Sequence, residues 1–190
     1  MKRILSMLVC AAMLSLAASS GQAQTLATVK ARGALNCGSN PGLAGFGLPD
    51  AQGNWTGFDI DFCRAVAAAI FDDPKKVKFV PLTAKDRFTA LQSGEIDVLA
   101  RNTTWTSSRD TALGLNFTGV NYYDGQGFMV RKELKVKSAL ELSEAAVCVG
   151  QGTTTELNLA DFASAHELSF KTLAFATTEQ AIAAEPAEQR

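Results

Sequence analysis

Strand-like and helix-like segments alternate along the sequence, and this alternation constrains the fold more than any other feature. Short apolar stretches at Leu35–Gly38, Val77–Pro81 and Ile96–Ala100 are typical of strands. Between them, the spacing of apolar residues predicts helices at Ile60–Phe71 and Asp86–Ser93. The order β-α-β-α-β favours a mostly parallel sheet with helices on its faces. We therefore expect an α/β fold.

The two predicted helices each carry an apolar face. Phe62, Val66 and Ile70 recur at helical spacing in the first helix, and Phe88 and Leu91 do so in the second. We expect Phe88 and Leu91 to face inward.

A second alternation of strands and helices follows Gly125–Gly127, a stretch that can absorb large backbone rotations and so suits a hinge. After Ala184 the pattern stops at a polar end, which leaves this second unit few elements for a core. We expect a first lobe over residues 24–123 and an incomplete second lobe over residues 124–190. Its predicted elements are strands Phe128–Val130, Ala146–Gly150 and Phe170–Ala174 and helices Thr154–Ala165 and Thr178–Ala184.

The first 23 residues have the organisation of a secretory signal peptide. Lys2 and Arg3 precede an apolar stretch, Ile4–Ala18, which is too short to span a bilayer comfortably. The small residues before Gln24 suit cleavage near Ala23. We therefore expect an exported protein that is not inserted in the membrane after cleavage.

The charge balance and the scarcity of reactive side chains exclude several functional classes. Eighteen basic and 19 acidic residues give a net charge of −1, which provides no strong field for nucleic acid. The single histidine, His166, lies at a polar helix end without catalytic partners, and the cysteine spacing matches no metal site. We therefore expect no nucleic-acid partner, no metal, no cofactor and no catalytic residue.

Three cysteines lie beyond the signal peptide: Cys37, Cys63 and Cys148. Export implies an oxidising compartment, where an odd number of cysteines is unusual. One pair can therefore form a disulfide. We favour Cys37 with Cys63, and the sequence leaves the other pairings open.

Two polar stretches directly follow predicted strands and carry the strongest functional signal. Residues 101–110 contain two arginines, an asparagine and five hydroxyl residues, a set suited to a carboxylate or a small zwitterion. In the second stretch, Thr153 and Glu156 form a capping box, and the helix start offers N–H groups to an anion. A polar loop and simple capping are the alternative interpretations. Because ligands of open α/β sheets bind at the carboxyl ends of strands, we expect a ligand clamped between the two lobes.

Further motifs resemble a known family. The segment Gly57–Phe62, followed by Val66 and Ile70, is similar to the signature of the extracellular solute-binding proteins of family 3, the periplasmic amino-acid-binding components of ABC importers. Within that family, residues 42–46 and 101–106 resemble the general L-amino-acid-binding members. The resemblance implies the periplasmic-binding-protein type II fold, a Venus flytrap of two α/β lobes. We assign the acidic residues of the signature a structural role and do not place them in the site.

The resemblance also implies which residues hold the carboxylate of the ligand. Arg109 corresponds to the arginine that grips the α-carboxylate. Thr153 and Thr154 correspond to the helix start that meets the same carboxylate from the other lobe.

The resemblance implies that the rest of the ligand contacts the first lobe. Arg101, Asn102 and Thr104 correspond to the polar segment that meets the α-amino group, and Asn40 and Leu43 to first-loop positions that line the side-chain pocket. Many family members have an acidic residue in place of Asn40 and an aromatic one in place of Leu43. These departures are compatible with broad specificity.

One departure concerns the C-terminal end. Family members carry a later aspartate that pairs with the ligand ammonium, and their chain then returns to complete the first lobe. This sequence reaches Arg190 before both features. We therefore expect a truncation, with a frameshift near Glu185 as one origin, so that the first lobe lacks its C-terminal return. The missing part would include a turn whose cysteine pairs with Cys148.

The leading hypothesis is thus a periplasmic solute-binding protein that delivers L-amino acids to an ABC permease at the inner membrane. Three alternatives remain: a truncated fragment without function, an enzyme of the dehydratase or lytic transglycosylase type on the same fold, and a sensor domain of a receptor. The enzyme is disfavoured because the site motifs offer no positioned acid or base.

Overall fold

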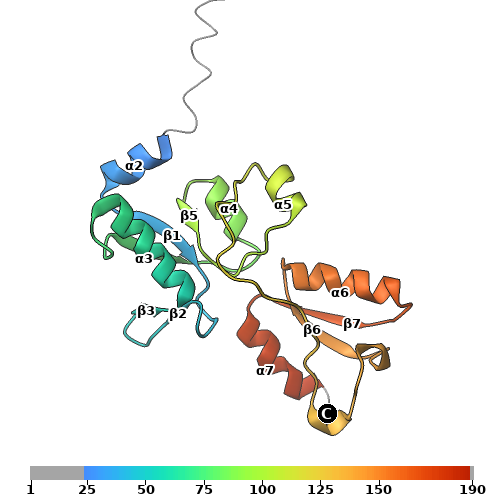
Figure 1. Cartoon of the computed structure of the whole chain (residues 1–190). Coiled ribbons are helices and arrows are strands. Elements are labelled where there is room, and N and C mark those ends of the chain that lie inside the picture. The colour runs from blue at the N-terminus through green and yellow to red at the C-terminus, as the bar shows by residue number, and fades with distance from the viewer. Residues whose placement is uncertain (1–23, 189–190) are drawn as a thin grey trace, which may run out of the picture.

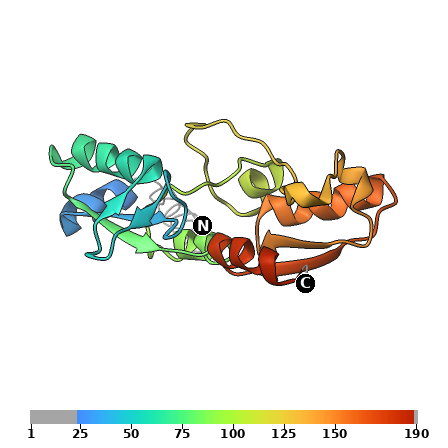
Figure 2. The same cartoon turned by 90° about the horizontal axis from the view of Figure 1, so that it is seen from below.

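The structure is a computed structural model and describes residues 24–188 of the chain. The predicted signal peptide lies outside these residues. Figure 1 shows two groups of elements, with α2, α3 and β1–β3 on one side and β6, β7, α6 and α7 on the other. Figure 2 shows the same two groups side by side along an elongated molecule. No helix within the described range is both long and apolar enough to cross a bilayer.

The first group is built on a parallel sheet in the order β4-β1-β5. Its strands are β1 (Leu35–Ser39), β4 (Val77–Pro81) and β5 (Val98–Leu99). The predicted β-α-β-α-β order is confirmed, because α3 (Phe58–Phe71) and α4 (Arg87–Gln92) connect these strands. Helix α2 (Gln24–Arg32) precedes β1.

The core of the first lobe lies between the sheet and α3. Cys37 of β1 and Cys63 of α3 are fully buried and form a disulfide, which confirms the favoured pairing. The buried face of α3 is centred on Ile60, Cys63 and Ala67. Phe62, on the predicted apolar face with Val66 and Ile70, lies beside this buried face and is 37% exposed.

A small hairpin follows β1 along the chain. Strands β2 (Leu48–Pro49) and β3 (Trp55–Thr56) pair antiparallel. The Asp50 carboxylate closes the turn by accepting hydrogen bonds from the backbone N–H groups of Gln52 and Asn54. This turn brings the chain back to the start of α3.

The second group contains two parallel strands, β6 (Ala146–Gly150) and β7 (Lys171–Phe175). Helix α6 (Thr154–Ala165) has the predicted bounds, and α7 (Thr178–Glu188) extends beyond its predicted end. Two short 3₁₀ turns, η2 (Lys132–Leu134) and η3 (Ala139–Glu141), precede β6 along the chain.

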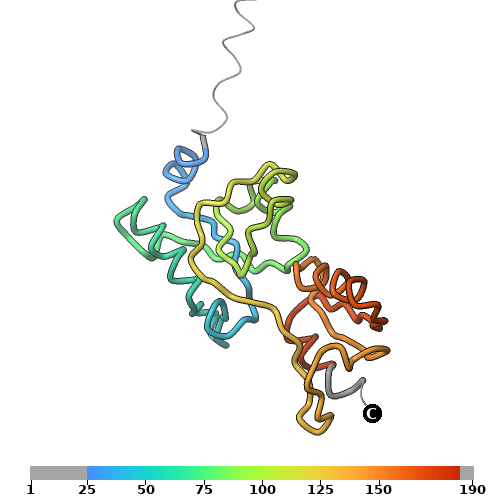
Figure 3. The backbone as a smooth tube through the Cα atoms, turned by 45° about the vertical axis from the view of Figure 1, so that its right-hand side comes forward, coloured from blue at the N-terminus to red at the C-terminus, as the bar shows by residue number. Residues whose placement is uncertain are grey.

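The predicted strand at Phe128–Val130 is wrong. Residues 114–131 contain neither helix nor strand, and Figure 3 shows this part of the chain, in yellow, crossing toward the second group. Phe128 instead packs its ring against Phe162 and Phe170, at centroid distances of 5.4 and 5.9 Å. A strand requires a hydrogen-bonded neighbour, and the described residues place none beside this segment.

Candidate functional site

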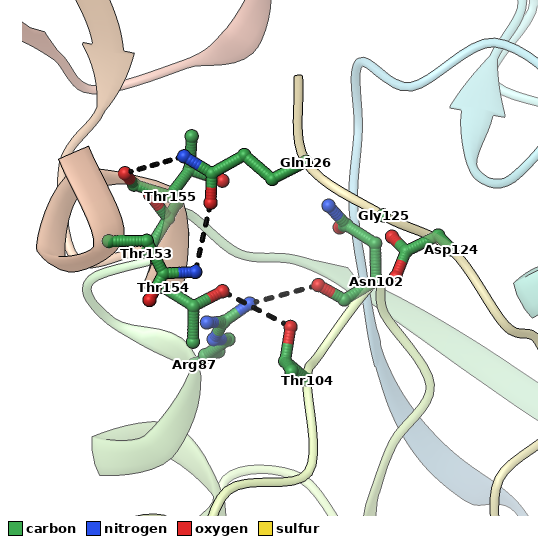
Figure 4. Close-up of a pocket in the computed structure, with 10 residues that line it drawn as sticks. Arg87, Asn102, Thr104, Asp124, Gly125, Gln126, Thr153, Thr154 and Thr155 are labelled. Carbon is green, nitrogen blue, oxygen red and sulfur yellow. Dashed lines mark hydrogen bonds between the residues drawn. The ribbon is translucent and has the colours of Figure 1, made fainter. Parts of the chain in front are cut away.

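A polar cavity of about 250 Å³ lies between the two lobes. Its lining residues come from the segment after β5, from α4, from the crossing segment (residues 114–131) and from the start of α6, as Figure 4 shows. The carboxyl ends of β5 and β6 thus both point to it, as the sequence predicted. Its lining residues are Arg87, Asn102, Thr104, Asp124, Gly125, Gln126, Thr153, Thr154, Thr155 and Asn158.

Arg87 forms the cationic part of the first-lobe wall. It projects from α4, is 2% exposed, and donates one hydrogen bond, from Nη1 to the carbonyl of Asn102 at 3.4 Å. Its Nε is buried without a hydrogen-bond partner. Burial, followed by repulsion from Arg101 and Arg109, lowers the pKa of the guanidinium to about 9, so that it remains charged at neutral pH. An anion in the cavity would relieve both the repulsion and the unpaired donor.

Arg109 lies near Arg87 but does not itself line the cavity. It belongs to α5 (Ser107–Ala112), a short helix capped by Thr106, whose hydroxyl accepts from the backbone N–H of Arg109. Its Nη1 donates to the carbonyl of Thr104 at 2.9 Å. The guanidinium groups of Arg87 and Arg109 both lie over the ring of Phe88, at 4.8 and 5.1 Å from its centroid. The ring therefore holds two like charges close to the cavity.

The second-lobe wall is the start of α6. The Thr153 hydroxyl accepts from the backbone N–H of Glu156 at 3.1 Å, and the Glu156 carboxylate accepts from the N–H of Gly152 at 2.8 Å. The predicted capping box is thus present, with its carboxylate one residue before the expected partner. Across the cavity, the hydroxyls of Thr104 and Thr154 lie 3.2 Å apart and join the two lobes (Figure 4).

Replacing Thr153 with alanine is expected to lower the free energy of unfolding by about 1 kcal/mol, because the cap of α6 is lost. Urea unfolding followed by circular dichroism measures this change. Thr155→Ala, at an exposed position of the same helical turn, is the matched control. Equal stabilities of the two variants would contradict a capping role for Thr153.

The structure brings four of the predicted ligand-binding residues to this cavity: Asn102, Thr104, Thr153 and Thr154. Leu43 and Arg109 line neither this cavity nor the second one described below. Leu43 is half-buried in the first loop, where it pairs with Gly47 through backbone hydrogen bonds.

Asn40 and Arg101 line a second, smaller cavity of about 90 Å³ between the lobes. The Arg101 Nε donates to the carbonyl of Leu82 at 3.2 Å, and burial lowers the pKa of Arg101 to about 10 against the opposing attraction of Asp59 and Glu179. The Glu179 carboxylate, from the first turn of α7, fills the space that a side chain at Gly42 would need.

Sequence reasoning missed several residues of the main cavity. Arg87 lies in a predicted helix, and its position beside Phe88, which is predicted to face inward, is the signal that could have identified it. The Gln126 side chain donates to the Thr155 carbonyl at 3.1 Å and accepts from the Asn158 side chain at 2.9 Å, so the predicted hinge also lines the site. Asp124 contributes a carboxylate from the same segment.

The sequence pattern of the bacterial extracellular solute-binding proteins, family 3, matches residues 35–184. The chain is 64% identical over 173 residues to the general L-amino acid-binding periplasmic protein AapJ of Rhizobium johnstonii, covering 91% of this chain and 51% of that protein. It is 62% identical to the glutamate/glutamine/aspartate/asparagine-binding protein BztA of Rhodobacter capsulatus, covering 84% of this chain and 47% of the relative.

Among solved structures, a periplasmic binding protein of an ABC transporter from Brucella ovis, with glutathione bound, superposes with a TM-score of 0.82. It is 59% identical, and the match covers 87% of this chain and 52% of that one. The predicted fold is therefore confirmed. The chain spans about half the length of the curated relatives it matches.

Proposed function

Because the chain belongs to the bacterial extracellular solute-binding proteins of family 3, we propose that it acts in the periplasm as the solute-binding component of an ABC importer for L-amino acids. It binds the ligand between its lobes and delivers it to a permease at the inner membrane. Two similar relatives are named as amino-acid-binding proteins, and this supports the proposed ligand class. The proposed export relies on the signal peptide predicted at residues 1–23.

The observation that carries the proposal is the composition of the main cavity. One wall is cationic through Arg87, and the facing wall is a helix start with Thr153 and Thr154. Such a pair of walls suits a carboxylate, which accepts bidentate hydrogen bonds from guanidinium and N–H groups at a helix N-terminus. Asp124, the only acidic residue among those that line the cavity, offers a partner for an ammonium group. An α-amino acid carries both charges.

The proposed roles of the remaining residues follow the family resemblance. We assign the α-carboxylate to Arg109, which shares the Phe88 ring with Arg87 but does not line the cavity in this structure, with Thr153 and Thr154 on its other side. The polar segment of Arg101, Asn102 and Thr104 meets the α-amino group. Asn40 and Leu43 belong to the first loop, which we assign to the ligand side chain; of the two, Asn40 lines the smaller cavity. The hydrogen bond from Asn40 Nδ2 to Asn102 Oδ1, at 3.1 Å, supports a link between these last two regions.

The proposal is tested by titrating the isotope-labelled chain with L-glutamate, L-glutamine and L-leucine and recording amide NMR spectra. We expect saturable shifts at Asn102, Thr104, Thr153 and Thr154, since these residues line the cavity. The corresponding amines, which lack the α-carboxylate, are the ligand control and are expected to bind at least about tenfold more weakly. A chain that gives no saturable shift with any common L-amino acid, up to millimolar concentration, contradicts the proposed function.

A further inference from the structure

Gln126 is a polar side chain of the main cavity that the proposed ligand roles do not use. It belongs to the crossing segment and lines the cavity. Its Nε2 donates to the carbonyl of Thr155 at 3.1 Å, and its Oε1 accepts from Nδ2 of Asn158 at 2.9 Å (Figure 4). Both partners lie in the first two turns of α6. Gln126 thus binds a main-chain group and a side-chain group of the helix that forms the second-lobe wall.

The crossing segment depends on such side-chain contacts, because it contains neither helix nor strand. On the first lobe, the ring of Tyr122 packs edge-on against that of Phe46, at a centroid distance of 5.0 Å. On the second lobe, Phe128 packs against Phe162 of α6 at 5.4 Å. Neither of these aromatic pairs lines the main cavity, whereas Gln126 does. Gln126 is therefore the contact that anchors the cavity-lining part of the segment to α6.

The turn that Gln126 contacts is the one we assign to the ligand carboxylate. The first N–H groups of a helix have no intrahelical acceptor, and those of Thr154 and Thr155 belong to this set. On the facing wall, the Nε of Arg87 is buried without a hydrogen-bond partner. A carboxylate between the walls would satisfy donors on both sides. The position of the α6 start relative to the rest of the cavity therefore decides how well both walls bind one group.

We propose that Gln126 is a positioning residue, which holds the start of α6 against the crossing segment in the arrangement that receives the ligand carboxylate. It acts through the Thr155 carbonyl and the Asn158 side chain. An amide suits this role because it has both a donor and an acceptor. This inference rests on the proposed function, since it assumes that the main cavity binds an α-amino acid.

The test compares Gln126→Met with Gln92→Met in the full chain. Methionine keeps the length of glutamine but has no hydrogen-bond donor and only a weak acceptor. Gln92 of α4 is exposed, donates to the Leu113 carbonyl at 2.8 Å and lines neither cavity, so its variant removes a bond of the same kind elsewhere. Asn158→Ala and the double variant Gln126→Met/Asn158→Ala complete the set.

Two ligands are titrated against each variant and followed by amide NMR. They are L-glutamate and 4-aminobutyrate, which is glutamate without its α-carboxylate. Unfolding midpoints are measured in parallel. The pair of ligands separates an effect on the α-carboxylate from a general effect on the cavity.

We expect Gln126→Met to bind L-glutamate about tenfold more weakly than the wild type, because the helix start is no longer pre-organised for the carboxylate. The affinity for 4-aminobutyrate should stay the same. Asn158→Ala should weaken L-glutamate binding by a smaller factor. The double variant should bind no more weakly than Gln126→Met, since Asn158 acts through Gln126. A merely structural Gln126 would lower the unfolding midpoint and leave the ratio of the two affinities unchanged.

The outcomes separate the two proposals. Unchanged L-glutamate affinity in Gln126→Met, or equal weakening of both ligands, overturns the positioning role. Losses that multiply in the double variant also overturn it, because each side chain would then contact the ligand by itself. If the wild type binds no amino acid, the proposed function fails. Displaced Thr154 and Thr155 amides in Gln126→Met, but not in Gln92→Met, would then still support the anchoring contact, and unmoved amides would refute it.

Discussion

If Arg109 has its proposed role, replacing it with methionine is expected to weaken the binding of every L-amino acid by about a hundredfold or more, because the α-carboxylate common to all of them loses its charged partner. Methionine retains an apolar side chain of similar length over the Phe88 ring. Calorimetry or NMR titration measures the loss. The variant also removes the hydrogen bond to the Thr104 carbonyl, so its unfolding midpoint must be recorded alongside.

Two controls make this result specific. Arg64→Met removes a cation that pairs with Asp61 on the outer side of α3, and it should leave binding unchanged. Amines without the α-carboxylate should bind Arg109→Met and the wild type equally. The variant Arg87→Met tests the alternative assignment of the carboxylate. Arg87 lines the cavity, whereas Arg109 does not. If Arg87→Met abolishes binding of all amino acids and Arg109→Met does not, the carboxylate belongs to Arg87.

Removing the disulfide is expected to lower the free energy of unfolding of the first lobe by about 3 kcal/mol. Cys37 and Cys63 are 26 residues apart in the sequence, and closing a loop of this length restricts the unfolded chain by about that amount. Both cysteines are fully buried between β1 and α3, so the double variant Cys37→Ala/Cys63→Ala also loses packing. Urea unfolding in oxidising buffer measures the difference.

The two tryptophans report on this lobe alone, since Trp55 and Trp105 both belong to it. Fluorescence therefore follows the lobe that contains the bridge. Cys148→Ala, in β6 of the other lobe, is the control and should leave the tryptophan transition in place. A double variant that loses less than about 1 kcal/mol would show that the bridge contributes little to this fold.

Much of the fold was predictable because its signals are local. The strands at Leu35 and Val77 and the helix from Thr154 to Ala165 follow from apolar spacing and from the capping residue Thr153, all within a few residues of one another. The strand predicted at Phe128 failed because pairing is not local. An apolar, β-prone stretch becomes a strand only where another strand offers hydrogen bonds, and here the aromatic side chains of the second lobe compete for Phe128.

The site residues also divide into those that local sequence signals predicted and those that only tertiary packing placed. Asn102, Thr104, Thr153 and Thr154 were found in the sequence because they follow strands of two parallel sheets whose carboxyl edges both face the cavity, and the family resemblance named them. Arg87 was not found, since it is a charged residue in a helix and resembles a solvated one. Its burial depends on how α4 packs and on the distant Asn102 carbonyl that accepts its hydrogen bond.

The sequence by itself determined the order of the elements, the helix caps, the disulfide favoured among the possible pairings, and the two polar segments that face each other. Tertiary structure alone decided that Arg87 and Arg109 share the face of Phe88 and that Arg87 meets the Asn102 carbonyl. The physical reason is the distance along the sequence over which each effect acts. Backbone preferences and apolar spacing act over one or two turns of chain, whereas desolvation and charge pairing depend on neighbours that only the packed lobes bring together.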